Sequence, residues 1–149
     1  MTPEARGRLT ATALFVPSAV VLGIARWLSP DPAGVGTHIQ LGLAPCGMMA
    51  WSGIPCPMCG MTTTFSLMAN LRPVDAVVNQ PFGVVLFAIT FIVALIGAME
   101  IVRPANRWDH FIKLTIGREV ALLSAFIVLM IGSWAYKAVA MGHFFTPPA

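Results

Sequence analysis

Charged residues are scarce in this chain: Asp, Glu, Lys and Arg together make up 10% of its 149 residues. A soluble domain usually carries about a quarter charged residues, so this chain cannot build a water-facing surface of the usual kind. Hydrophobic residues make up 57% of the sequence, and the mean hydropathy is +0.80. The composition excludes an ordinary soluble domain and predicts an integral membrane protein.

The chain also lacks the motifs of common enzyme classes. It holds no carboxylate pair, no Ser/His/Asp set and no phosphate-binding glycine loop. Its formal net charge of +3 comes from nine Lys and Arg residues that form no long basic run. We expect these charges to set membrane orientation and expect no binding to nucleic acid. The sequence leaves open whether the protein is an enzyme.

Three apolar stretches have the length of about twenty residues that a helix needs to cross the hydrocarbon core. They cover residues 9–28, 82–102 and 119–141. We therefore predict an all-α membrane protein, a single integral domain over residues 1–149, with three transmembrane helices. The charged residues near the ends of these helices are expected to extend to the lipid headgroups; they are Arg26, Glu100 and Lys137.

The segment between the first two spans, residues 29–81, contains the distinctive chemistry of the chain. Residues 29–55 hold four prolines and five glycines, so we expect a loop there. Pro57 suits the first turn of a helix, which can run to about Leu71 before Pro73 stops it. This helix is too short to span, and we expect it to be re-entrant or interfacial. We also expect a short helix over residues 74–79 and an interfacial helix within residues 103–118.

On a helical period, polar residues from the cysteine motif onward fall on one stripe. The members of this stripe are Cys56, Cys59, Thr63, Ser66 and Asn70. The sequence therefore predicts two thiols at the head of a polar helix face.

Orientation follows from the distribution of basic residues. Residues 1–8 and the connection between the second and third spans carry six of the nine Lys and Arg residues, whereas residues 27–71 carry none. By the positive-inside rule the first two segments are cytoplasmic. We therefore predict a cytoplasmic N-terminus, with the cysteine motif on the external face, where disulfides persist.

The three cysteines, Cys46, Cys56 and Cys59, allow three interpretations. In the first they bind a metal: Cys-Pro-x-Cys-Gly resembles the knuckle of zinc sites, in which two thiolates reach one ion. Cys46 would be the third ligand and His38 the fourth, so zinc is the candidate cofactor. His143, in the C-terminal tail on the same side, is a weaker candidate.

In the second interpretation the protein is a membrane thiol–disulfide oxidoreductase. A Cys-x-x-Cys pair at a helix N-terminus has a thiolate stabilised by backbone N–H groups, so Cys56 and Cys59 would be catalytic and Cys46 a relay, with a quinone as a candidate acceptor. In the third interpretation, the cysteines are structural. They are either packed as small apolar residues, or one disulfide joins Cys46 to Cys56 or to Cys59. Spacing alone does not separate the three.

The motif also resembles a known family. Pro45-Cys46, Gly53, Cys56-Pro57-Met58-Cys59-Gly60-Met61-Thr62 and Gln80-Pro81 are similar to the pattern of the bacterial domain of unknown function numbered 2752, whose members are small polytopic membrane proteins. Thr63 and Gln80 stand where that pattern has Arg and Asn. The resemblance implies a bacterial inner membrane protein and a cysteine cluster, but no reaction.

From these observations we predict a small membrane protein with an external cysteine cluster, present as a metal site or a disulfide staple. Its role would be structural or to bind a membrane-protein partner within the lipid bilayer. The oxidoreductase remains the alternative.

Overall fold

The computed structural model of the chain describes residues 3–103, 105 and 107–142. Within these residues every regular element is helical. The elements in chain order are α1 (Pro3–Trp27), the 3-10 helix η1 (Thr37–Leu41), α2 (Gly47–Ser52), α3 (Met61–Ala69), α4 (Pro73–Asn79), α5 (Pro81–Val102), α6 (Arg107–Thr115) and α7 (Glu119–Ala140).

Three helices are long and apolar enough to cross a membrane: Ala5–Trp27 of α1, and α5 and α7 over their whole lengths. This confirms the predicted all-α fold class with three potential spans. The short helices on either side of Pro73 are confirmed too, but α3 begins at Met61, four residues later than the predicted start at Pro57. The loop of residues 29–55 contains two short helices, η1 and α2, that were not predicted.

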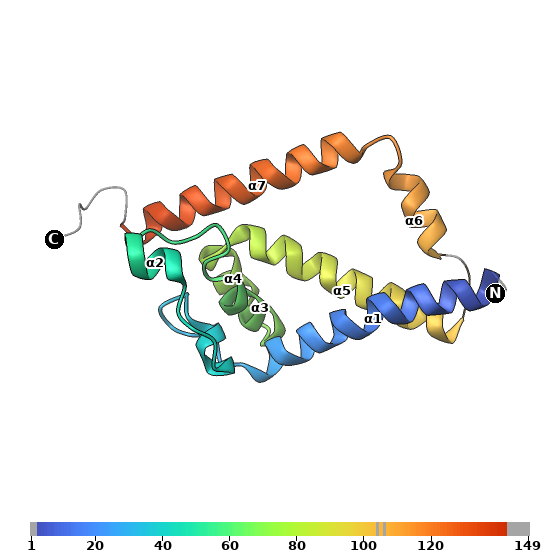
Figure 1. Cartoon of the computed structure of the whole chain (residues 1–149), viewed down its shortest axis with the longest axis horizontal. Helices are drawn as coiled ribbons and strands as arrows, with labels where there is room; N and C mark the ends of the chain where they lie inside the picture. The colour runs from blue at the N-terminus through green and yellow to red at the C-terminus, as the bar shows by residue number, and fades with distance from the viewer. Residues whose placement is uncertain (1–2, 104, 106, 143–149) are drawn as a thin grey trace.

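Helices α1 and α5 pack along each other and form the main helical pair (Figure 1). Gly97 of α5 lets the two backbones approach, because a Cβ atom there would lie 2.9 Å from Phe15 Cβ and 3.2 Å from the Ala11 carbonyl oxygen. Ala11 is fully buried at this crossing. Small residues at a crossing are the usual way in which transmembrane helices pack, since lipid offers no hydrophobic driving force between them.

The short helices α3 and α4 lie at one end of this pair, next to the start of α5 (Figure 1). Gly83 allows α3 to approach α5, because a Cβ atom there would lie 2.9 Å from Thr64 Cγ2. Phe65 of α3 also meets Phe87 of α5 edge to face, with ring centroids 5.4 Å apart. The short helices are thereby fixed on the main pair.

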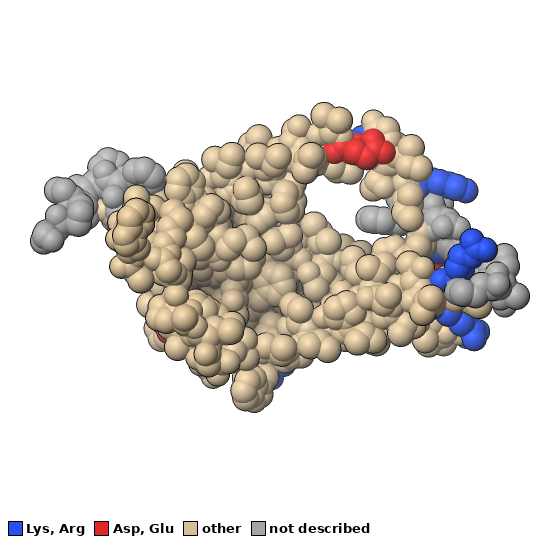
Figure 2. Space-filling view, in the orientation of Figure 1, with Lys and Arg blue, Asp and Glu red and all other residues tan. Residues whose placement is uncertain are grey.

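Helix α7 runs from α6 back to the end that carries α2, and its first turns are splayed from the other spans (Figure 1). In the space-filling view an opening separates the start of α7 from the rest of the molecule (Figure 2). Within the first half of α7, Phe126 meets Phe82 at the start of α5, with ring centroids 4.9 Å apart. The Ser133 hydroxyl also accepts a hydrogen bond from the Phe82 backbone N–H, at 3.2 Å.

Candidate metal centre

The three cysteines converge at the end of the molecule that carries α2. Their Sγ atoms all lie within 4.8 Å of one another. All three are described by the structure and all are free thiols, so the disulfide staple is not confirmed. Cys59 is buried, and Cys46 and Cys56 are half-buried. The sequence-based expectation of a cysteine cluster is therefore confirmed.

Two backbone turns bring the sulfur atoms together. Cys46 stands at the N-cap of α2, and its carbonyl oxygen accepts the Ala50 N–H at 2.9 Å. Cys56 and Cys59 lie in a turn closed by a 2.9 Å hydrogen bond from the Cys59 N–H to the Cys56 carbonyl oxygen. Neither residue is within α3, because Gly60 has a φ of 88° and separates the turn from the helix. A residue without a Cβ adopts this left-handed conformation readily.

The predicted polar stripe is present in α3 itself, and it holds the loop that follows α1. Ser66 Oγ donates to the Leu28 carbonyl oxygen at 2.5 Å, and the hydroxyls of Thr63 and Thr37 are hydrogen-bonded at 2.8 Å. Asn70 Nδ2 donates to the Ser66 carbonyl oxygen at 2.8 Å. These groups stabilise the fold and do not join the thiol cluster.

Three side chains from later in the chain hold carbonyl oxygens of the motif. Trp134 Nε1 of α7 donates to Pro55 O at 2.7 Å, and Gln80 Nε2 donates to Pro57 O at 3.0 Å. Asn79 Nδ2 of α4 donates to Gly60 O at 3.2 Å. The turn that carries two of the thiols is thus fixed at both ends and in the middle, as a preformed binding loop requires.

Local environment gives the three thiols different acidities. A hydrogen bond from the Met49 backbone is the main factor that lowers the pKa of Cys46. Burial raises the pKa of Cys56, and it raises the pKa of Cys59 from 9.0 to about 11. The Cys-x-x-Cys pair therefore lacks the lowered pKa that activates an attacking thiol. A metal ion, in contrast, displaces thiol protons as it binds.

The geometry fits a thiophilic metal ion. Zinc–sulfur bonds of about 2.3 Å in a tetrahedral site place neighbouring sulfur atoms about 3.8 Å apart. The cluster needs a contraction of at most about 1 Å to reach this separation, starting from sulfur atoms within 4.8 Å of one another. Soft sulfur ligands suit zinc and monovalent copper, whereas calcium and magnesium prefer oxygen.

His38 is not part of the group of ligand atoms within 4.8 Å. Its Nε2 atom is instead hydrogen-bonded to the Ala44 carbonyl oxygen, at 3.1 Å. His143, the weaker candidate, lies outside the described residues. The structure therefore brings together three of the four principal ligands predicted from the sequence.

Met49 is a sulfur-bearing neighbour that sequence reasoning missed. Its Sδ atom lies 3.9 Å from Cys59 Sγ, a separation typical of two ligands of one tetrahedral ion. The sequence did contain a pattern that could have indicated Met49 as a ligand. Cys46 and Met49 are three residues apart, which is the spacing of Cys56 and Cys59.

Lys137 of α7 was also missed. It was expected to reach the headgroups, but it is buried, with 6% of its surface exposed. Its Nζ atom donates to Asn79 Oδ1 at 2.6 Å and to the Gly34 carbonyl oxygen at 3.2 Å. No local pattern signals this position, because Gly34 and Asn79 lie far from Lys137 in the sequence.

Comparison with known proteins agrees with the motif. Residues 46–94 match the family described as "protein of unknown function (DUF2752)", which supports the resemblance seen in the sequence. The matched segment includes all three cysteines, α3, α4 and the first part of α5. No curated protein and no solved structure matches the chain.

Proposed function

We propose that residues 1–149 form a single bacterial inner membrane domain whose external loop binds one transition-metal ion, with zinc as the metal. Cys46, Cys56 and Cys59 would supply three thiolates. The observation that carries this proposal is the convergence of three free thiols within 4.8 Å, since a disulfide would use only two of them. The metal would fix the loop as a rigid surface for a membrane-protein partner.

The charge distribution supports an external location for the cluster. Most basic side chains seen in Figure 2 lie at the end of the molecule that carries the N-terminus of α1 and α6, away from the motif (Figures 1 and 2). Arg26, Arg72 and Lys137 lie nearer the motif, and each is bonded to another residue there. At the motif end, Trp51 of α2 is 92% exposed, as is typical of a tryptophan at a membrane–water interface. We infer that the basic end faces the cytoplasm and that α2 lies at the outer surface.

Metal analysis of the purified protein tests this function. After reduction and removal of metal in detergent, the protein should bind one zinc ion per chain and lose three reactive thiols at the same time. Cys59→Ser should weaken zinc binding by more than the roughly 10- to 100-fold typical of an outer-shell partner, because it removes a ligand. Met58→Leu is the matched control, since Met58 lies between two cysteines but is 54% exposed.

The oxidoreductase alternative gives the opposite result in the same preparation. A Cys56–Cys59 disulfide that forms and breaks reversibly at a defined potential, together with failure to bind zinc, would overturn the metal site. The result would support thiol–disulfide exchange instead. Burial raises the pKa of Cys56 and of Cys59, which disfavours either of them as the attacking thiol, whereas the pKa of Cys46 is lowered.

A further inference from the structure

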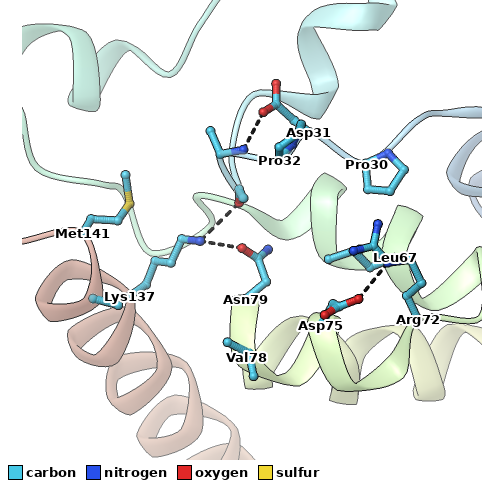
Figure 3. Close-up of a pocket in the computed structure, with 13 residues that line it drawn as sticks. Pro30, Asp31, Pro32, Leu67, Arg72, Asp75, Val78, Asn79, Lys137 and Met141 are labelled. Atoms are coloured by element: carbon cyan, nitrogen blue, oxygen red, sulfur yellow. Dashed lines mark hydrogen bonds and ion pairs between the residues drawn. The ribbon is translucent and has the colours of Figure 1, made fainter.

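Lys137 is a buried cation without an acidic partner. Two of its N–H donors are used by uncharged acceptors, Gly34 O and Asn79 Oδ1 (Figure 3). Among the residues that the structure describes, the ion pairs are Arg72–Asp75 and Arg107–Glu100, and neither includes Lys137. A buried charge is strongly destabilising unless an opposite charge lies near it, so the position calls for an anion.

The pocket beside Lys137 does not supply this anion. It has a volume of about 430 Å³, and its two carboxylates, Asp31 and Asp75, have other partners (Figure 3). Asp31 Oδ1 accepts the Ala33 N–H at 2.8 Å, and Asp75 pairs with Arg72 at 2.7 Å.

The turn that carries two of the cysteines reaches Lys137. A Cβ atom on Gly60, the residue after Cys59, would lie 3.4 Å from Lys137 Nζ. Cys59 therefore lies close enough to Lys137 for its thiolate to interact electrostatically with the ammonium group. Asn79 links the two positions, because its Oδ1 accepts from Lys137 and its Nδ2 donates to Gly60 O.

We propose that Lys137 is the built-in counter-charge of the metal–thiolate centre and that it matches a divalent ion. This inference rests on the proposed metal site. Three thiolates around a divalent ion carry a net charge of −1, which one ammonium group neutralises. Three thiolates around monovalent copper would carry −2, and the described residues place only this one buried Lys or Arg side chain at the cluster. Lys137 is thus a positioning residue that favours assembly of a zinc centre.

Substitutions that separate charge from packing test the inference. Lys137→Gln keeps an N–H donor but removes the charge, and Lys137→Met is a second neutral variant should the first not fold. Lys137→Arg keeps the charge. Arg72→Met is the matched control, because Arg72 lines the same pocket but is largely exposed and paired with Asp75. Zinc affinity is measured in detergent by competition with a chromophoric chelator.

The neutral variants should bind zinc about 10- to 100-fold more weakly, the range for loss of an outer-shell partner. Lys137→Arg and Arg72→Met should stay close to the wild type. Thermal unfolding is measured with and without zinc to distinguish a purely structural effect. A packing defect would lower the melting temperature under both conditions and leave the increase caused by zinc unchanged. Wild-type affinity in a neutral variant, or an unchanged shift, would overturn the inference. Absence of zinc binding by the wild type would instead overturn the metal site itself.

Discussion

The two ends of helix α7 are held in different ways. Near the motif, Ser133, Trp134, Tyr136 and Lys137 each make a side-chain hydrogen bond to another segment. In the first half, Ser124 bonds only within its own helix, to Val120 O at 2.7 Å, and Val120 and Val128 are 80% and 70% exposed. Polar contacts between helices are therefore concentrated where the thiols converge, while the first half of α7 presents mainly apolar side chains, of which Phe126 packs on Phe82.

This difference indicates that the motif end is held rigidly, as the proposed metal site requires, whereas the first half of α7 serves mainly to cross the membrane. Substitutions at the two places should therefore differ in their effect on zinc affinity.

The largest effect is expected for Gly60→Ala. Gly60 has a φ of 88°, and a Cβ atom there would lie 2.7 Å from the Gly34 carbonyl oxygen. The left-handed conformation alone costs an alanine about 1–2 kcal/mol, and the backbone contact adds to this. We expect loss of zinc binding together with a lower melting temperature in detergent.

Gly132→Ala is the control for this substitution, because nothing lies within 4 Å of a Cβ atom at that position of α7. It should leave zinc affinity unchanged and raise helix stability by up to about 1 kcal/mol. Equal effects of the two alanines would contradict the distinction between the two regions.

An intermediate effect is expected for Trp134→Phe, which removes the N–H donor to Pro55 O. A hydrogen bond of this kind contributes about 1 kcal/mol, so we expect about that loss in unfolding free energy and a few-fold weaker zinc binding. Ser124→Ala, in the first half of α7, should change stability by less than about 0.5 kcal/mol. Unfolding in denaturant, with and without zinc, measures both.

The smallest effect on the metal site is expected for Glu100→Gln, at the far end of α5. The Glu100 carboxylate is buried and binds Arg107 Nη1 at 3.2 Å and the Ala105 N–H at 2.9 Å. Its replacement should destabilise the docking of α6 by about 1–3 kcal/mol and leave zinc affinity unchanged, because distant sites act independently. Faster proteolysis within residues 103–118 would report the loosened helix, and a change in zinc affinity would show that the two ends are coupled.

Local sequence patterns were sufficient for the architecture. Length and apolar composition predicted the three long helices, and prolines predicted the breaks around α3 and α4, because these signals act within one segment. The cysteine spacing predicted a cluster, since three thiols within fourteen residues of one loop cannot lie far apart.

Patterns failed where the structure depends on distant partners. Lys137 and Glu100 were expected at the headgroups, but both are buried with partners that no helical period reveals. Arg26 is exposed, as expected, but it also donates to Asn70 Oδ1 at 2.7 Å, forty-four residues away, a partner that the pattern did not predict. The start of α3 was placed four residues too early, because Gly60 breaks the helical conformation with a φ of 88°. Its carbonyl oxygen is held by Asn79, nineteen residues away, which no local pattern reveals. His38 was included as a ligand on loop proximity alone, and its ring instead bonds a backbone oxygen.

The bond from Trp134 to Pro55 joins residues seventy-nine positions apart, and this has a consequence for biosynthesis. In the proposed topology, a nascent chain would expose all three thiols outside the membrane before α7 has been inserted. During that interval the motif has neither its Trp134 donor nor the Lys137 ammonium. Completion of the proposed site would thus depend on insertion of α7, and metal binding would report that α7 is in place.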